Sequence, residues 1–258
     1  MARPAPQFDN TADVAPGISV DPAEIARFAA MAAEWWDLNG KFRPLHKLNP
    51  VRLAYIRDRL CTHFKRDLKR PRPLAGLRIL DIGCGGGLVA EPLTRLGASM
   101  VAIDASATNI GIARTHAAES ELAIDYRHGT AEDLAAAGER FDAVLALEIV
   151  EHVADLSAFL AAAATLTKPD GALFVATLNR TPQSYLLAIV GAEYVLRWLP
   201  VGTHDWKKFV RPSELGAALR QSGVELRDLT GITYNPLADT WRAGRDLAVN
   251  YMAFALKS

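Results

Sequence analysis

The sequence predicts an α/β fold built on a largely parallel, doubly wound sheet. From Arg78 onward, short apolar runs typical of buried strands alternate with alanine-rich helical stretches. The first run leads into a glycine-rich turn, and two helical segments precede it. The chain has 258 residues, half of them apolar, which is enough to bury one large core. We therefore expect a single domain over residues 21–258, after a disordered tail at 1–20.

Composition excludes several functional classes. Acidic and basic residues balance at 29 each, so the chain lacks the basic excess of a nucleic-acid-binding protein, and we expect no nucleic-acid partner. Two cysteines are too few for a disulfide framework, which favours a reducing compartment. The proline- and alanine-rich N-terminus lacks the apolar stretch of a signal peptide, and no run approaches the roughly 20 apolar residues of a membrane span. These features predict a cytoplasmic protein.

Two helices are expected before the first strand. Asp21-Pro22 is a helix-start signal, and apolar residues follow it at helical spacing, which predicts a helix from 22 to about 37. Asn49-Pro50 repeats the signal and predicts a second helix, which ends before the proline-rich stretch at 71–73.

The remaining elements follow from apolar runs and their spacing. Expected strands cover 78–82, 99–104, 123–128, 141–147 and 171–177. This rhythm breaks over 179–211, and a further helix is expected to start near Pro212. Two closely spaced runs, 224–234 and 248–256, then predict an antiparallel addition to the sheet.

The glycine-rich turn predicts a nucleoside cofactor site. Residues 80–87 place an acid and several glycines, Gly83 and Gly85 among them, at a strand end where the backbone can approach a ligand. Asp104 ends the next strand, where a carboxylate can accept hydrogen bonds from both ribose hydroxyls. A dinucleotide fingerprint needs a small residue where this chain has Leu88, which weighs against NAD. Asp81 adds a negative charge that suits a cationic ligand, and S-adenosylmethionine carries a sulfonium and an ammonium.

Each of these residues also has an ordinary structural interpretation. Asp81 can be a turn former and Asp104 a surface acid, although together with the glycines they favour a cofactor site. After the third strand, Ala131 and Glu132 can lie over the adenine, or Glu132-Asp133 can simply cap a helix.

The segment Glu148-Ile149-Val150-Glu151-His152 follows the fourth strand, at the sheet edge where such folds bind ligands. If Glu148 begins a helical turn, Glu151 and His152 lie on its face, and the three side chains can hold a divalent cation or act as general acid and base. The alternative is that the acids favour the helix dipole and His152 is a polar cap.

Residues 185–199 are mostly apolar and are followed by the basic, aromatic stretch 206–209. Such a segment can lie on a membrane surface or cover an apolar pocket. An ordinary core helix followed by a solvated loop is equally consistent with this composition.

Several motifs together resemble the ubiquinone-biosynthesis O-methyltransferases, within the wider class I S-adenosylmethionine-dependent methyltransferases. The resemblance runs from about Asp21 to the C-terminus. The resemblance rests on the following motifs: Trp35-Trp36-Asp37, Asn49 to Leu53, Asp81 to Gly87, Glu148 to Val153, Thr177 to Arg180, Gly191 to Tyr194, Gly202 to Asp205 and Asn250 to Met252. It implies a Rossmann-like sheet of seven strands in the order 3-2-1-4-5-7-6, with the last strand antiparallel.

The resemblance also implies an activity and a set of site residues. It implies methylation of the phenolic hydroxyl of 2-polyprenyl-6-hydroxyphenol and of 3-demethylubiquinol. Expected cofactor residues are Arg52, Asp81, Gly83, Gly85, Asp104, Ala131, Glu132 and Leu147. Glu148, Glu151 and His152 are the expected ligands of Mg²⁺ or another divalent cation, and His152, Glu148 or His204 the expected catalytic groups.

For its setting, the resemblance implies a bacterial cytoplasmic enzyme at the inner face of the membrane, with a polyprenylated substrate and other ubiquinone-biosynthesis enzymes as partners. The insertion at 179–211 would be its lid or membrane contact. Three alternatives stay open: a class I methyltransferase with another phenolic or lipid acceptor, a non-catalytic cofactor-binding scaffold, and a nicotinamide oxidoreductase.

Overall fold

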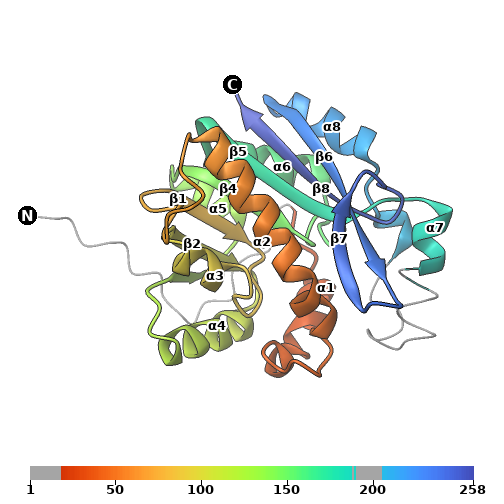
Figure 1. The fold of residues 1–258 in the computed structure, drawn as a ribbon, viewed down its shortest axis with the longest axis horizontal. Helices are drawn as coiled ribbons and strands as arrows, with labels where there is room; N and C mark the ends of the chain where they lie inside the picture. The colour runs from red at the N-terminus through yellow and green to blue at the C-terminus, as the bar shows by residue number, and fades with distance from the viewer. Residues whose placement is uncertain (1–18, 188, 190–204) are drawn as a thin grey trace, which may run out of the picture.

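The computed structural model describes residues 19–187, 189 and 205–258, and its centre is one eight-stranded sheet (Figure 1). The strand order is β3-β2-β1-β4-β5-β8-β6-β7. The strands are β1 (Arg78–Ile82), β2 (Ser99–Asp104), β3 (Asp125–His128), β4 (Phe141–Leu147), β5 (Thr167–Leu178), β6 (Val224–Asn235), β7 (Thr240–Gly244) and β8 (Asn250–Lys257). The first five strands are parallel, and β8 runs antiparallel between β5 and β6. The expected methyltransferase order is thus present, with β7 as an additional edge strand.

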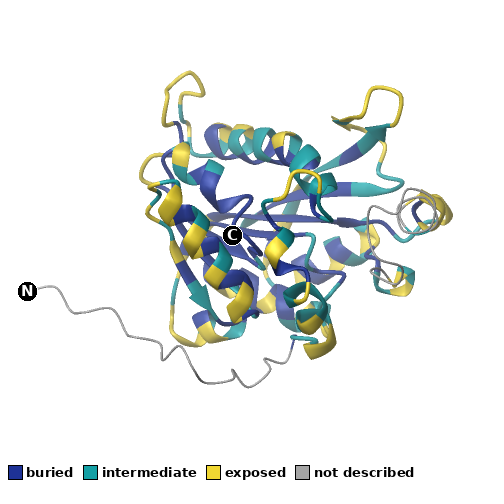
Figure 2. Cartoon of the chain, turned by 90° about the horizontal axis from the view of Figure 1, so that it is seen from below, coloured by how far each residue is buried: buried dark blue, intermediate teal, exposed yellow. Residues whose placement is uncertain are grey.

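Helices cover both faces of this sheet, which forms the dark, buried middle layer of Figure 2. Adjacent residues of β1 show why: Ile79 packs on one face and Leu80 on the other, because side chains alternate along a strand. The helices α2 (Arg43–His63), α3 (Ala90–Arg95) and α4 (Ala107–Glu119) cover the first face. The helices α5 (Ala131–Ala136), α6 (Leu156–Leu166) and α8 (Pro212–Gln221) cover the second.

The two N-terminal helices are present, but their predicted bounds were wrong. Helix α1 (Pro22–Ala29) starts as predicted, with Asp21 as its side-chain cap, but it ends early and gives way to a short 3-10 helix, η1 (Ala32–Glu34). Helix α2 begins seven residues before Pro50, because Pro44 already occupies its first turn. Pro50 is therefore a proline inside a helix rather than its start.

Most predicted strands are confirmed closely. The bounds of β1, β2 and β4 agree with prediction, while β3 starts two residues late and β5 starts four residues early. The predicted antiparallel pairing of the two C-terminal runs is confirmed by β6 and β8. Along the chain, β7 lies between β6 and β8, and in the sheet it is the edge strand. It was not predicted, because its residues are mostly exposed and carry no apolar run.

The N-terminal boundary needs one correction. Ser19, predicted to be in a disordered tail, is buried at 2% exposure, and its carbonyl accepts a hydrogen bond from the backbone N–H of Ala154 at 2.8 Å. Residues 1–18 lie outside the described chain. Within the described residues, no helix is both long and apolar enough to cross a bilayer.

Candidate active site

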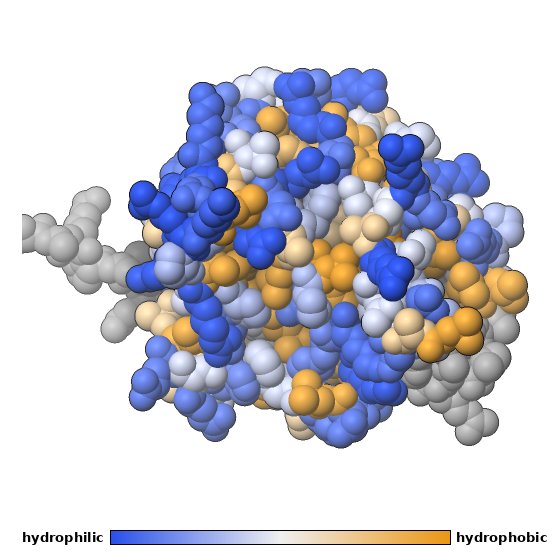
Figure 3. Space-filling model, in the orientation of Figure 1, coloured by the Kyte–Doolittle hydropathy of each residue, from blue (hydrophilic) through white to orange (hydrophobic). Residues whose placement is uncertain are grey.

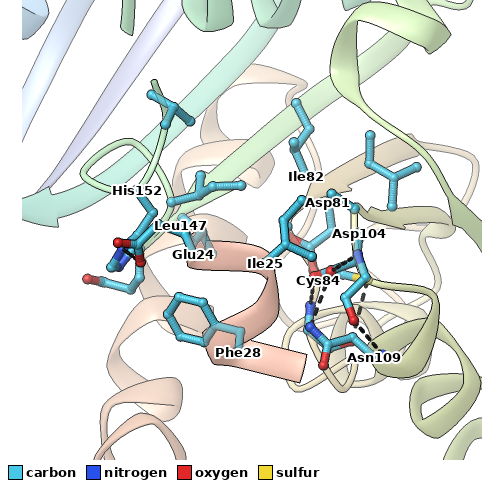
Figure 4. Close-up of a pocket in the computed structure, with 18 of the residues that line it drawn as sticks. Glu24, Ile25, Phe28, Asp81, Ile82, Cys84, Asp104, Asn109, Leu147 and His152 are labelled. Atoms are coloured by element: carbon cyan, nitrogen blue, oxygen red, sulfur yellow. Dashed lines mark hydrogen bonds and ion pairs between the residues drawn. The ribbon is translucent and has the colours of Figure 1, made fainter. Parts of the chain in front are cut away.

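A cavity of about 250 Å³ opens at the carboxyl ends of β1, β2 and β4, beneath the N-terminal segment (Figure 4). Parallel strands all present their carboxyl ends at one edge, which is where such folds bind ligands. Every predicted site residue that the structure describes lines this cavity. These are Arg52, Asp81, Gly83, Gly85, Asp104, Ala131, Glu132, Leu147, Glu148, Glu151 and His152.

The glycine turn fits closely against its neighbours. Gly83 and Gly85 both have positive φ, at 73° and 53°, a conformation that costs any residue with a Cβ. A Cβ on Gly83 would lie 2.3 Å from Ile149, and one on Gly85 would lie 2.3 Å from the ring of Trp35. Trp36 donates its indole N–H to the carbonyl of Gly86 at 3.0 Å. Trp35 and Trp36 of the N-terminal segment therefore pack against and hydrogen-bond to this turn.

Asp104 is held by three donors at the end of β2. Its carboxylate accepts the backbone N–H groups of Gly85 at 2.9 Å and Ser106 at 2.8 Å, and the side-chain amide of Asn109 at 3.2 Å. Burial raises the pKa of Asp104, although these hydrogen bonds counteract the effect. The carboxylate is thus fixed between the glycine turn and α4, at the cavity wall.

Arg52 brings a buried positive charge to the same cavity. It is 3% exposed and donates to the side-chain oxygen of Asn49 at 3.2 Å, but its Nε has no hydrogen-bond partner among the described residues. Burial lowers the pKa of the guanidinium, and the charges of Glu148 and Asp81 oppose that shift. Since buried polar groups normally find partners, the unpaired Nε indicates room for an anionic ligand group.

Two carboxyl groups lie near this arginine, the buried Asp81 and the partly buried Glu148. Burial raises the pKa of Asp81 to about 7, with the charge of Arg52 opposing and that of Asp104 adding to the shift. Burial also raises the pKa of Glu148 to about 7, with a further increase from Glu151. Perturbed carboxyl groups around one cavity are typical of functional sites.

The loop after β3 confirms the helix-cap interpretation, and the contact of Ala131 and Glu132 with an adenine stays a prediction. Thr130 and Asp133 form a reciprocal capping box at the start of α5, so the helix cap is real. Glu132 nevertheless turns to the cavity, where one carboxylate oxygen accepts the N–H and hydroxyl of Ser19. The other oxygen, Oε2, is buried without a partner among the described residues.

The segment from Glu148 to His152 is a turn and not the helical start that the sequence suggested. Glu148 has a φ of 53°, which breaks any helix at its first residue, and the N–H of His152 closes a turn on the carbonyl of Ile149 at 2.8 Å. Glu151 is buried and accepts the hydroxyl of Thr177 at 2.7 Å. The predicted common helical face is therefore absent.

The predicted metal set does not converge in this arrangement. In the part of the chain that the structure describes, no three histidine, cysteine, aspartate or glutamate side chains are placed to hold a metal ion. Glu151 is engaged by Thr177, and Nδ1 of His152 lies 3.0 Å from a carboxylate oxygen of Glu24. The metal assignment stays a prediction.

Two further predicted features fall wholly or partly beyond the described residues. His204, a candidate catalytic group, lies among residues 190–204, for which no structure is described. Of the 179–211 insertion, α7 (Pro182–Ser184) and η3 (Trp206–Lys208) are described, and the indole N–H of Trp206 donates to the carbonyl of Thr181 at 2.9 Å.

Sequence reasoning missed several residues that line the cavity, among them Glu24, Phe28 and Asn109. Glu24 and Phe28 reach it from α1, and Asn109 from α4 (Figure 4). Glu24 looked like a helix-start acid and Phe28 like an apolar face residue. Asn109 had a usable signal, because it lies five residues after Asp104 in the turn and helix that follow the cofactor strand.

Comparison with known proteins identifies related sequences and a matching domain family. Residues 80–175 match the family model of the methyltransferase domain. The chain is 59% identical over 237 residues to a ubiquinone biosynthesis O-methyltransferase of Brucella ovis, covering 92% of this chain and 96% of the relative. It is 60% identical over 244 residues to the protein of that name from Parvibaculum lavamentivorans, covering 95% and 96%.

Solved structures share the fold at low identity. Magnesium protoporphyrin IX methyltransferase of Synechocystis, solved with bound SAH, has a TM-score of 0.56 at 20% identity, with 80% of this chain and 82% of that chain covered. A possible histamine N-methyltransferase of Thermotoga maritima has a TM-score of 0.57 at 20% identity, with 92% and 99% covered. The chain therefore belongs to the family of ubiquinone biosynthesis O-methyltransferases, which use S-adenosylmethionine as methyl donor.

Proposed function

We propose that this protein transfers the methyl group of S-adenosylmethionine to a phenolic oxygen of polyprenylated phenols of ubiquinone biosynthesis, namely 2-polyprenyl-6-hydroxyphenol and 3-demethylubiquinol. The observation that carries the proposal is the cavity at the carboxyl edge of the sheet. The cavity combines the buried Arg52 with the imidazole of His152. It also contains two carboxyl groups, Asp104, which suits ribose hydroxyls, and Asp81, which suits an ammonium group. The names of the close relatives supply the substrate class.

The cavity residues suit the parts of this cofactor. The unpaired Nε of Arg52 matches the methionine carboxylate, and Asp81 supplies negative charge for the ammonium. Asp104 suits the ribose hydroxyls, and Glu132, with its unpaired Oε2, suits the adenine edge beside Ala131. Leu147 offers an apolar contact where β4 ends.

The chain has two tasks once both substrates are bound, alignment and deprotonation. Bound S-adenosylmethionine supplies an electrophilic methyl group on a sulfonium. A cavity that fixes the acceptor oxygen in line with that methyl converts an encounter into an effectively unimolecular step. A phenol has a pKa of about 10, so at neutral pH it needs a base beside its hydroxyl. His152 is the described cavity residue best suited to accept that proton.

The acceptor tail gives a reason for the apolar surface beside α7. Tyr185, Leu186 and Leu187 are 50%, 59% and 51% exposed, and Figure 3 shows apolar side chains at this end of the molecule. A polyprenyl tail resides in a bilayer, so we propose that this end docks on the inner membrane surface. Replacing all three residues with serine should weaken sedimentation with anionic liposomes, and unchanged sedimentation would contradict this docking.

Methyl transfer from labelled S-adenosylmethionine to a short-chain polyprenyl catechol in detergent tests the activity. Labelled product would support it, whereas tight cofactor binding without product would direct attention to other acceptors. The same assay tests the predicted metal set. Loss of transfer in EDTA with recovery on adding Mg²⁺ would support it, and transfer indifferent to EDTA would contradict it.

A further inference from the structure

The N-terminal helix contributes a carboxylate to the histidine of the cavity. Oε2 of Glu24 lies 3.0 Å from Nδ1 of His152, across 128 positions of sequence. Both side chains are largely buried, at 13% and 11% exposure. The ring of Phe28, one helical turn after Glu24, lies edge-on to the imidazole at 5.1 Å. In Figure 4, α1 carries both residues towards His152.

Polar and apolar contacts together hold helix α1 in this position. None of its eight residues is fully buried, but Phe28 packs against the apolar cluster that contains Met31 and Trp35. The start of the helix is fixed by the bond from Ala154 to the carbonyl of Ser19 and by Lys208, whose Nζ lies 3.1 Å from Asp21. The same Lys208 Nζ lies 3.9 Å from the second oxygen of Glu24. The carboxylate of Glu24 is thus itself held in place.

A carboxylate at one imidazole nitrogen decides where the ring carries its proton. An ionised carboxylate only accepts hydrogen bonds, so neutral His152 keeps its hydrogen on Nδ1 when it bonds to Glu24. Nε2 is then the basic nitrogen. The bond, together with the Phe28 edge contact, also fixes the plane of the ring.

We propose that Glu24 is the positioning residue of the methyl-transfer reaction, which holds His152 in the Nδ1–H tautomer and in a fixed orientation towards the acceptor hydroxyl. This proposal rests on the proposed function and extends it to the N-terminal helix. The active site is therefore complete only when α1 is seated over the cavity.

Two variants and one matched control test this role by kinetics. Glu24→Ala should lower kcat about 100-fold, the scale of one general-base contribution, with KM for both substrates within about threefold of the wild type. Glu24→Asp restores the carboxylate and should bring kcat back at least tenfold relative to Glu24→Ala. Glu34→Ala removes another ion-paired glutamate of the same segment, paired with Lys41, and should leave kcat unchanged.

A double-mutant cycle shows whether Glu24 acts through the histidine. If it does, adding Glu24→Ala to His152→Ala should lower kcat no further, because the partner is already gone. A further fall in the double variant would overturn the proposal. So would a Glu24→Ala enzyme with normal kcat and raised KM, since that result describes a helix that only covers the cofactor.

Nitrogen-15 NMR of histidine-labelled protein reads the tautomer without any turnover. The His152 signal, assigned by its loss in His152→Gln, should report Nδ1–H in the wild type and a shift towards Nε2–H in Glu24→Ala. An unchanged tautomer would contradict the proposal. If the wild type fails to methylate a polyprenyl catechol while the tautomer responds as expected, the proposed function fails but the pairing of Glu24 with His152 stands.

Discussion

Trp35 donates its indole N–H to the side-chain oxygen of Asn109 at 3.1 Å, and both residues are buried. Asn109 in turn donates its amide hydrogen to Asp104 at 3.2 Å. The ring of Trp35 also stacks on Phe42, with centroids 3.7 Å apart. Trp35 therefore helps to orient Asn109, and Asn109 helps to fix Asp104, the carboxylate proposed to bind the ribose.

Trp35→Phe tests this connection, because it removes the N–H donor and keeps an aromatic ring, although it also removes part of the packing against Gly85. We expect S-adenosylmethionine affinity to fall by about 1 kcal/mol, the typical net value of one hydrogen bond, or roughly fivefold. Isothermal titration calorimetry measures it. Affinity equal to that of the wild type would show that Asn109 orients Asp104 without help.

Asp104→Ala removes the carboxylate itself. The loss should cost about 1.5–3 kcal/mol of cofactor binding, as expected for hydrogen bonds to a charged group. Asp58→Ala is a matched control, because Asp58 is an exposed carboxylate paired with Arg57 on α2, away from the cavity. Equal affinities for the two variants would remove Asp104 from the cofactor site.

Cofactor binding should release protons near neutral pH. Burial raises the pKa of Asp81 to about 7, so in the free protein this carboxyl is partly protonated there. A ligand with net positive charge favours the ionised form, so binding lowers the pKa and affinity should rise between pH 6 and 8. Calorimetry in buffers of different ionisation enthalpy counts the protons. Proton uptake, or affinity that falls with pH, would contradict the assignment.

The same carboxyl should make the cofactor-free protein less stable as pH rises. The pKa of Asp81 is about 7 in the folded protein, whereas its ordinary value, which applies to the unfolded chain, is 3.8. Between about pH 4 and pH 7 the folded state therefore retains a proton that the unfolded state has lost. The stabilisation is complete below pH 4 and is lost as pH passes 7. At pH 8, Asp81→Asn should therefore raise the free energy of unfolding, by about 2 kcal/mol. Chemical denaturation at pH 5 and pH 8 tests this, and a gain no larger at pH 8 than at pH 5 would contradict it.

The sequence predicts the parallel strands well, because buried runs such as 143–147 are continuous and are bounded by polar or glycine residues. Exposed or ambiguous elements were harder. The edge strand β7 has no apolar pattern, and Asn49-Pro50 resembles a helix start although α2 is already two turns long there.

The site was predictable where function depends on local sequence and unpredictable where it depends on packing. The glycine turn and Asp104 are close in the chain, and the family resemblance supplied Arg52. The contact of Glu24 with His152 joins the first helix to a turn after β4, and no sequence pattern encodes it. The positive φ of Glu148 has no signal in the sequence either, so the pattern there is consistent with a helical turn that the structure does not contain.

Two glycines offer a matched test of the cofactor turn. Gly85→Ala places a methyl group against the ring of Trp35 at a positive φ, which should destabilise the fold by at least about 1–2 kcal/mol and impair cofactor binding. Gly111→Ala, on the exposed face of α4, meets nothing within 4 Å and should stabilise it by about 0.5–1 kcal/mol. Thermal unfolding with and without cofactor separates the two effects. A Gly85→Ala protein that binds normally would contradict the close fit of this turn.

We propose that one cavity holds both S-adenosylmethionine and a phenolic acceptor. The most direct test of this proposal is the transfer of labelled methyl to a polyprenyl catechol, measured for the wild type, Asp104→Ala and His152→Ala. We expect O-methylated product from the wild type. Asp104→Ala should form little product at low cofactor concentration and recover at high concentration. His152→Ala should form little product at any cofactor concentration. Equal transfer by all three proteins, or none from a wild type that binds the cofactor, would contradict the account.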